Sequence, residues 1–260
     1  MTIGEAIILG IVQGLSEFLP VSSSAHLVLV EHWLGISSAD LIFEVAVHAG
    51  TLLSVLWFFR ARLLEFARAT IGSGVESRFS TGRREVLWLI VGTIPAAIIG
   101  LAFKDQIEAT FSDPFQTAIQ LIIAGLLLLS LKSCKFGNKD VTLASSWWIG
   151  CAQAVSILPG ISRSGATICT GLWMGIRPAV AAEFSFLLSI PAVGGAIILM
   201  LPDAWGSDRL GMAHLVGATV AAFTGYGALR LVFAFLRGGR FALFGVYCVI
   251  VGALAAFLLK

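Results

Sequence analysis

The stretch "QGLSEFLPVSSSAHL", residues 13–27, places a group of polar side chains inside an otherwise apolar part of the chain. The flanking segments are "IGEAIILGIV" at 3–12 and "VLVEHWLGI" at 28–36. The stretch holds a carboxylate, an amide, an imidazole and four serine hydroxyls, with Pro20 in the middle. Proline removes a backbone donor and clashes with the preceding helical turn. A spanning helix needs about 20 apolar residues, so neither half can cross a membrane alone.

The composition indicates an integral membrane protein. Of the 260 residues, 58% are hydrophobic and 12% are charged, whereas soluble domains carry roughly 25% charged residues. The length suits one membrane domain over residues 1–260, surrounded by membrane lipid. The formal net charge of +2 is too small to indicate a nucleic-acid partner.

A second apolar region, 147–176, is also interrupted at a proline, in "ILPGISRSG" around Pro159. Irregular backbone at membrane depth is tolerated only where protein or a wet cavity covers it. We therefore predict an all-α integral membrane fold with two re-entrant helix-loop-helix hairpins, at about 3–35 and 147–176, each with a polar loop at its tip. Six further stretches are long enough to be transmembrane helices: about 41–59, 86–103, 115–131, 179–201, 213–235 and 241–259.

The two interrupted regions resemble each other. "GIVQGLSEFLPVSSS" from Gly10 and "GCAQAVSILPGISRS" from Gly150 share Gly, Gln, Ser, Leu-Pro and a serine three positions after the proline. Later, "VGTIPAAIIG" at 91–100 matches "VGATVAAFTG" at 216–225 at five of ten positions. We predict repeats of one hairpin plus three spans, at about 1–131 and 147–259. Because three is odd, the second copy must be inverted, as in many membrane transporters.

The positive-inside rule predicts the orientation. Twelve basic residues fall on one predicted side and three on the other. The first group is Arg60, Arg62, Arg68, Arg78, Arg83, Arg84, Lys132, Lys135, Lys139, Arg177, Arg237 and Arg240, and the second is Lys104, Arg209 and Lys260. The first group is expected in the cytoplasm and both chain termini outside. The first hairpin then enters from outside and the second from the cytoplasm, so their tips can meet.

The two tips together would form a phosphate site. The first carries Gln13, Glu17, Ser22, Ser23, Ser24 and His26, and the second carries Gln153, Ser162, Arg163, Ser164 and Thr167. The planar guanidinium of Arg163 offers paired donors that match phosphate oxygens. Gly160 and Gly165 let the backbone approach closely, and a helix that starts after the tip would point free N–H groups at the same anion.

The residues leave several roles open. Ser23 and His26 could act as nucleophile and base in either assignment. Glu17 could orient the imidazole or hold a divalent cation, since Mg²⁺ accepts one carboxylate with other oxygens and waters. The alternatives are structural: a Glu17–Arg163 pair that closes the hairpins, serines as helix caps, and His26 as a packing residue. Glu44 and Glu183, at matching repeat positions, could each hydrogen-bond to a hairpin backbone or serve a function.

Three motifs, "QGLSEFLPVSSSAH", "LPGISRSGATI" and "EFSFLLSIP", closely resemble the undecaprenyl-diphosphate phosphatase family of the bacitracin-resistance type, over essentially the whole chain. The resemblance implies hydrolysis of an isoprenoid lipid diphosphate to the monophosphate, which recycles the lipid carrier of bacterial cell-wall synthesis. It also implies a divalent cation (Mg²⁺ or Ca²⁺), a bacterial inner-membrane location and an active site facing the periplasm. A homodimer is left open.

Carried over by position, the catalytic residues are Glu17, Ser23, His26 and Arg163. The phosphate-binding residues are Gln13, Ser22, Ser162, Ser164 and Thr167, with Glu17 as the metal ligand. Gln13 stands where some members have a second glutamate, and Ala25 replaces the usual glycine before the histidine. The alternative function is a transporter that flips the lipid carrier phosphate through the same site.

Overall fold

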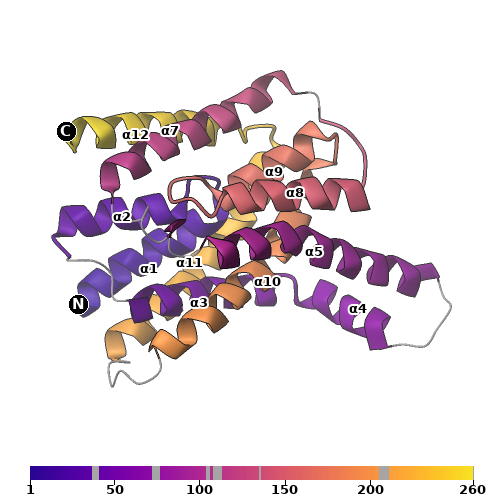
Figure 1. Ribbon diagram of the computed structural model, residues 1–260, viewed down its shortest axis with the longest axis horizontal. Helices are drawn as coiled ribbons and strands as arrows, with labels where there is room; N and C mark the ends of the chain where they lie inside the picture. Colours follow the sequence, from indigo (N-terminus) through magenta and orange to yellow (C-terminus); the bar gives the residue numbers. More distant parts are fainter. Residues whose placement is uncertain are drawn as a thin grey trace.

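The computed structural model describes residues 1–36, 41–71, 77–103, 106–107, 113–134, 136–204 and 211–259, and these are largely helical. The elements are α1 (Ile3–Phe18), α2 (Ser23–Leu34), α3 (Leu41–Phe58), α4 (Arg60–Ile71), α5 (Ser77–Ala102), α7 (Pro114–Leu129), the 3₁₀ turn η1 (Ser130–Ser133), α8 (Leu143–Val155), α9 (Arg163–Trp173), α10 (Pro178–Ala204), α11 (Met212–Arg237) and α12 (Leu243–Leu258) (Figure 1). The all-α prediction is confirmed for this part of the chain.

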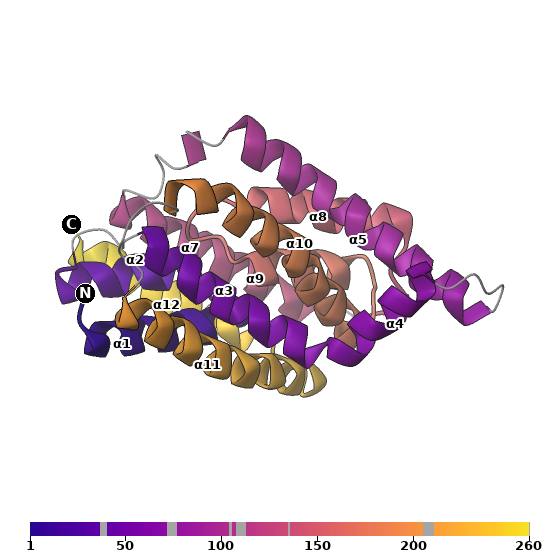
Figure 2. The same cartoon turned by 90° about the horizontal axis from the view of Figure 1, so that it is seen from below.

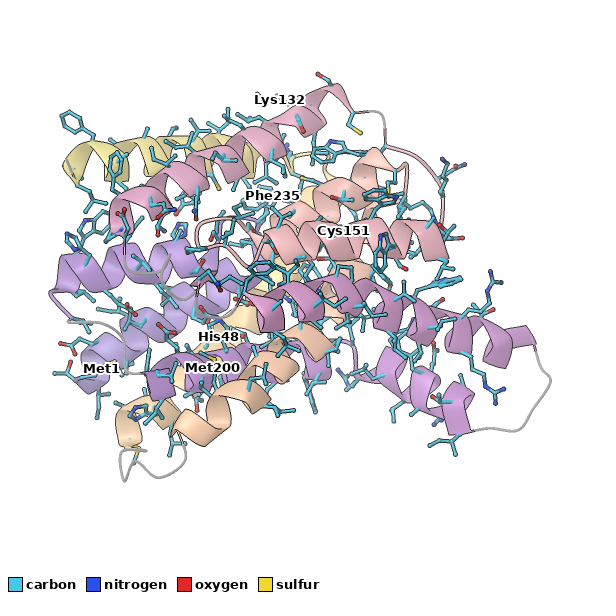
Figure 3. The ribbon with its side chains drawn as sticks, in the orientation of Figure 1. Met1, His48, Lys132, Cys151, Met200 and Phe235 are labelled. Atoms are coloured by element: carbon cyan, nitrogen blue, oxygen red, sulfur yellow. The ribbon has the colours of Figure 1, made fainter. Side chains whose placement is uncertain are left out.

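Five helical segments are long and apolar enough to cross a membrane: Leu41–Phe58, Thr81–Ala102, Pro114–Ser133, Pro178–Met200 and Met212–Arg237. The sixth predicted span is α12, which is equally apolar but has only 16 residues. Hydrocarbon side chains project from the outer faces of the bundle (Figure 3), and residues such as Phe223 and Phe257 are more than three-quarters exposed. Such faces suit lipid, so the protein is a multi-pass membrane protein.

The segment 60–84, which lies between the predicted spans 41–59 and 86–103, contains α4 and the first turns of α5. Its sequence "RARLLEFARATI" is rich in good helix formers and buries Phe66 and Ala69. The Arg83 side chain donates to the Ala69 carbonyl at 2.6 Å, which ties α5 to α4. Because the segment is rich in arginine, it contains no apolar run from which a helix would be predicted. Among the residues used for orientation, Lys104, Lys135, Arg209 and Lys260 and the side chain of Arg78 lie outside the described part.

Each of the two interrupted regions forms a pair of helices, α1 with α2 and α8 with α9, and we call each pair a hairpin. α1 begins at a capping box between Thr2 and Glu5, and α8 begins at one between Thr142 and Ser145. The α1–α2 hairpin starts at the end of the molecule where α12 finishes, and α4 lies at the opposite end in both views (Figure 1, Figure 2). The turns of both hairpins therefore lie in the middle of the long axis.

Glycines let the hairpins pack closely on the spanning helices. A Cβ on Gly10 of α1 would lie 2.6 Å from the carbonyl oxygen of Gly217 in α11. A Cβ on Gly150 of α8 would lie 2.3 Å from the carbonyl oxygen of Gly92 in α5. In lipid, small residues of this kind allow helices to associate through backbone contact. These contacts fix where each hairpin sits along its partner.

Candidate active site

The two hairpin turns are in direct contact. The Gly160 amide donates to Ser24 Oγ at 3.2 Å, and Ser164 Oγ donates to the Leu19 carbonyl at 3.2 Å. Arg163, the first residue of α9, donates from Nη2 to Glu17 Oε1 at 2.5 Å. The predicted meeting of two polar tips is thus found, and each bond joins segments more than 130 residues apart in the chain.

Serine caps start the second helix of each hairpin. Ser22 Oγ accepts from the Ala25 amide at 3.5 Å, and Ser162 Oγ accepts from the Gly165 amide at 3.1 Å. Ser22 has φ of +67°, the sole positive value among the described residues other than glycine. A residue held in that region costs about 1–3 kcal/mol and persists only where its surroundings fix it. The chain therefore turns sharply just before Ser23.

Glu17 is the centre of the site. Its Oε2 accepts from Ser23 Oγ at 2.6 Å and from Gln13 Nε2 at 3.1 Å, while Oε1 accepts from Arg163. His48 Nε2 lies 3.9 Å from the same Oε2 atom. The residue is 9% exposed, and a buried charge of this kind needs paired partners. The closest group able to remove a proton from the Ser23 hydroxyl is therefore Glu17.

Two buried polar atoms beside Glu17 have no hydrogen-bond partner. They are Nη1 of Arg163 and Oε1 of Gln13. A buried donor or acceptor left unpaired costs roughly 1–3 kcal/mol, so such atoms need an explanation. One guanidinium nitrogen holds Glu17 while the other is available to an anion. The free amide oxygen is available to a cation or a water.

His26 does not pair with Ser23. Its Nδ1 lies 2.8 Å from the Ser22 carbonyl and its Nε2 lies 2.8 Å from the Tyr247 hydroxyl. The ring folds back along its own helix, and the nucleophile and base roles considered for these two residues stay predictions. Glu17 likewise approaches the imidazole of His48 rather than that of His26.

The remaining phosphate-binding candidates are buried around the second tip. Ser162 Oγ and Ser164 Oγ lie 3.2 Å apart. Thr167 Oγ1 donates to the Arg163 carbonyl at 2.8 Å and lies 2.6 Å from Ser185 Oγ of α10. On the first tip, Ser22 Oγ lies 3.1 Å from Ser24 Oγ. These hydroxyls connect the tips to each other and to α10, so they shape the site rather than point freely into it.

Gln153 and Glu183 take different positions from their repeat counterparts. Both amide atoms of Gln153 are buried without a partner, whereas Gln13 donates to Glu17. Glu183 accepts from Arg62 Nε at 3.1 Å near the α4 end of the bundle, which differs from the bond to a hairpin backbone that was one of its two possible roles. The two partners of this ion pair are 121 positions apart, so no local sequence pattern predicted it.

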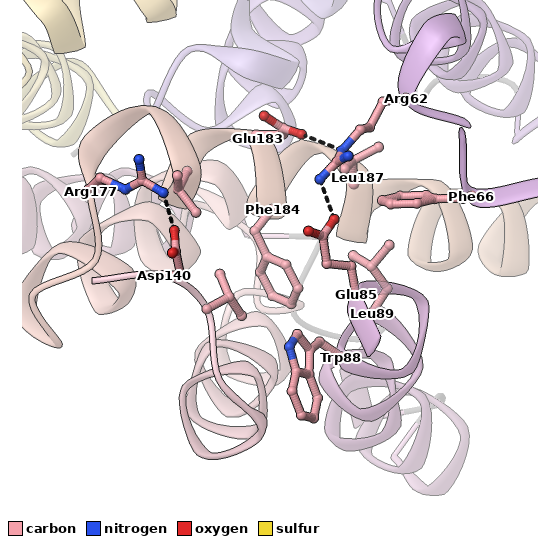
Figure 4. Close-up of a pocket in the computed structure, with 12 residues that line it drawn as sticks. Arg62, Phe66, Glu85, Trp88, Leu89, Asp140, Arg177, Glu183, Phe184 and Leu187 are labelled. Atoms are coloured by element: carbon pink, nitrogen blue, oxygen red, sulfur yellow. Dashed lines mark hydrogen bonds and ion pairs between the residues drawn. The ribbon is translucent and has the colours of Figure 1, made fainter. Parts of the chain in front are cut away.

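A pocket at the α4 end contrasts with the tip site. Arg62, Glu85, Asp140, Arg177 and Glu183 line it above an apolar floor (Figure 4). Arg62 is paired with three carboxylates, and Arg177 is paired with Asp140. Burial lowers the pKa of Arg62, but the carboxylates outweigh this and raise it. Because Nε, Nη1 and Nη2 of Arg62 are each bonded to a carboxylate, Arg62 has no nitrogen left over of the kind that Arg163 presents.

The donor set at the tips fits a loosely held divalent cation. No cluster of three or more His, Cys, Asp or Glu side chains occurs among the described residues. Glu17 and the unpartnered Gln13 Oε1 are oxygen donors side by side, and Mg²⁺ commonly uses one carboxylate with waters and substrate phosphates. The residues therefore suit Mg²⁺ better than a metal that requires a full protein cage.

Neither Tyr247 nor His48 was predicted as a residue of the site. Tyr247 is one of only two tyrosines in the chain and one of the few polar side chains of an apolar helix, which was the available signal. His48 follows Glu44 by one helical turn, and its Nδ1 lies 2.8 Å from the Glu44 carbonyl. That contact directs Nε2 toward Glu17.

The comparison with known proteins covers nearly the whole chain. Residues 6–254 match the family described as bacitracin resistance protein BacA. A protein of Desulfosudis oleivorans named undecaprenyl-diphosphatase is 43% identical over 95% of both chains. Two further proteins of the same name are each 40% identical to this chain. The one from Desulfatibacillum aliphaticivorans matches over 96% of both chains, and the one from Methanobrevibacter smithii matches over 97% of this chain and 96% of the relative. With its paired proline-broken tips and this match along its length, the chain belongs to the bacitracin resistance protein BacA family.

Proposed function

We propose that this protein hydrolyses undecaprenyl diphosphate to undecaprenyl phosphate and phosphate. The observation that carries the proposal is the unpartnered, buried Nη1 of Arg163 beside the hydrogen-bonded pair of Ser23 and Glu17. A phosphate oxygen bound at Nη1 would lie near a hydroxyl whose proton already points at a carboxylate. The names of the relatives support the same substrate.

The first step is attack of Ser23 Oγ on the terminal phosphorus. Glu17 accepts the hydroxyl proton, a Ser–O–P bond forms, and the bridging P–O bond breaks. Arg163 stabilises the charge on the transferring oxygens, which is the main requirement of phosphoryl transfer. The leaving lipid monophosphate takes the proton from Glu17 and departs.

The second step is hydrolysis of the phosphoserine. Glu17, again a carboxylate, accepts a proton from the attacking water and returns it to Ser23 Oγ as the Ser–O–P bond breaks. Free phosphate is released and the hydroxyl is restored. A cation held by Glu17 and Gln13 would supply charge neutralisation at the diphosphate oxygens. His26 belongs to the same turn, and its contacts are those of a residue that supports Ser23.

The membrane arrangement belongs to the same proposal. We infer six spans, with α12 as the sixth, and two re-entrant hairpins that enter from opposite sides. Gly10 contacts Gly217, and Gly150 contacts Gly92. In the repeat alignment Gly10 matches Gly150 and Gly92 matches Gly217, so the two contacts are equivalent. This equivalence supports inverted repeats of residues 1–131 and 147–259. Arginines gather at the α4 end, which supports a cytoplasmic location for that end. The first hairpin then opens to the periplasm of a bacterial inner membrane.

In the cell, this reaction would recycle the lipid carrier of cell-wall synthesis and confer bacitracin resistance. A homodimer stays a prediction. Flipping of the lipid phosphate also stays a prediction. It can be tested with the Ser23→Ala variant in proteoliposomes: if this variant no longer hydrolyses the diphosphate but still moves lipid phosphate across the bilayer, the protein has both roles.

The test of the proposal is phosphate release from undecaprenyl diphosphate by purified protein in detergent with Mg²⁺. Ser23→Ala should lower the rate at least a hundredfold, and rapid acid quench should trap phosphoserine on the wild-type protein only. The matched control is Ser16→Ala, which removes a hydroxyl of the same hairpin that donates to the Val12 carbonyl at 2.5 Å. Turnover by Ser23→Ala at the wild-type rate would remove Ser23 from the mechanism.

A further inference from the structure

Helix α12 contacts the first tip through two adjacent side chains. The Tyr247 hydroxyl lies 2.8 Å from His26 Nε2, and the two rings are nearly parallel, with an interplanar angle of 9° and centroids 5.7 Å apart. The Cys248 thiol donates to the Pro20 carbonyl at 3.6 Å. A helix that is otherwise hydrocarbon and glycine therefore directs both groups at the turn between α1 and α2.

The hydrogen bonds of His26 fix which ring nitrogen carries the proton. Nδ1 faces the Ser22 carbonyl at 2.8 Å, and a carbonyl oxygen only accepts, so Nδ1 carries the hydrogen. In the neutral ring, Nε2 then has the lone pair and accepts from the Tyr247 hydroxyl. Both nitrogens are occupied and the ring cannot rotate without breaking both bonds. Such a ring is a support and not a free base.

The hydrogen bonds that begin at Tyr247 lead through His26 to Ser22 in the strained turn. The Ser22 carbonyl accepts from His26 Nδ1 and also from the His26 backbone amide at 3.2 Å. Ser22 is the residue with φ of +67°, and Ser23 follows directly. A strained conformation of this kind persists only when its neighbours hold it. Loss of the Tyr247 or His26 bond would therefore let the turn relax and move Ser23 away from Glu17.

We propose that Tyr247 is a positioning residue that acts through His26 and Ser22 to place the Ser23 hydroxyl. This rests on the proposed function, in which Ser23 attacks the terminal phosphorus. His26 then serves as a brace with its Nδ1–H, and the proton of Ser23 goes to Glu17. The proposal adds α12 to the two hairpins as a third element that builds the site.

Two replacements of His26 separate a brace from a base. His26→Asn keeps an N–H donor close to the position of Nδ1 but has no basic nitrogen, whereas His26→Gln places its amide nearer the position of Nε2. We expect His26→Asn to retain a kcat at least tenfold above that of His26→Gln. Equal loss of activity in both variants would show that His26 is needed as a base and would overturn the proposal.

Tyr247→Phe keeps the stacked ring and removes only the hydroxyl. We expect kcat to fall five- to tenfold, with KM within twofold of wild type. In the His26→Asn background, where Nε2 is absent, the same change should have no further effect, because coupled residues are not additive. The matched control is Tyr226→Phe, since the only other tyrosine bonds Arg230 on α11, and it should retain the wild-type rate. A wild-type kcat in Tyr247→Phe, or an equal loss in both backgrounds, would refute the positioning role.

A readout without turnover keeps this proposal separate from the proposed function. In protein labelled with ¹⁵N-histidine, the resonance of the unprotonated His26 Nε2 should shift in Tyr247→Phe and stay in place in Tyr226→Phe. If the wild-type protein released no phosphate from undecaprenyl diphosphate, the proposed function would fail while this shift still reported the brace. An Nε2 resonance unchanged by Tyr247→Phe would show that the brace is absent.

Discussion

Arg163→Lys tests the division of labour between the two guanidinium nitrogens. In the structure, Nη2 holds Glu17 at 2.5 Å and Nη1 is buried without a partner. A lysine has one nitrogen on a flexible stem and cannot present the same planar fork. If that nitrogen keeps the pair with Glu17, the donor for the phosphate is lost. If it turns to the phosphate, the buried carboxylate loses its cation.

The expected loss follows from the single missing bond. A hydrogen bond to a charged group contributes about 1.5–3 kcal/mol, so kcat/KM should fall about 10- to 150-fold. Affinity for the product undecaprenyl phosphate should fall as well, since the same donor would bind it. The fold should survive, because a lysine retains the positive charge that the buried Glu17 requires.

The assay is steady-state phosphate release, together with thermal unfolding of the purified variant in detergent. Arg230→Lys is the matched control, because Arg230 also lies in a membrane-spanning helix but contacts Tyr226, away from the tips. It should retain the wild-type kcat/KM. Unchanged kinetics in Arg163→Lys would make Arg163 a structural link between the hairpins, and the free Nη1 would then have no part in substrate binding.

Three further predictions address the base, the packing and the orientation. Glu17→Gln keeps the size of the side chain but removes the base for Ser23, so turnover should fall at least a hundredfold, about 2.7 kcal/mol, while the protein stays monodisperse by size exclusion. Retained turnover would show that the charge of Glu17 takes no part in the chemistry. Gly150→Leu forces a side chain against the Gly92 carbonyl oxygen, from which even a Cβ would lie only 2.3 Å away, so the unfolding temperature should fall. The control is Gly195→Leu, where an added Cβ would have no neighbouring atom within 4 Å, and equal unfolding temperatures in the two variants would contradict the close packing. In a cysteine-free background of intact cells, Ile71→Cys should be shielded from an impermeant thiol reagent and Phe103→Cys should react, and the reverse pattern would invert the orientation.

The hairpins could be predicted because their signal is local. Pro20 and Pro159 each interrupt an apolar run too short to span on either side, and the polar residues around them make sense only at a covered tip. The pairing of Glu17 with Arg163 followed from bringing the two tips together. It was predicted as one structural alternative among several, and the structure adds that a second guanidinium nitrogen is left over.

The parts that could not be predicted depend on contacts across long stretches of chain or on a choice of side-chain rotamer. The bond from Tyr247 to His26 joins residues 221 positions apart, and that from Arg62 to Glu183 joins residues 121 apart. The sequence left Ser23 and His26 open as nucleophile and base in either assignment. The imidazole instead turns back to the Ser22 carbonyl, which a sequence pattern cannot specify.

The arrangement explains why so many polar residues share one short stretch. On one continuous helix through residues 13–27, Glu17 and Ser23 would be six positions apart and would point about 120° away from each other around the circumference. The break at Pro20 reverses the chain, so that the last turn of α1 and the first turn of α2 face each other, and Ser23 reaches Glu17 at 2.6 Å. The second hairpin then supplies the positively charged guanidinium of Arg163, and α12 supports the turn. The chemistry is concentrated in the first tip because the reversal places a base and a hydroxyl from the same short segment at bonding distance.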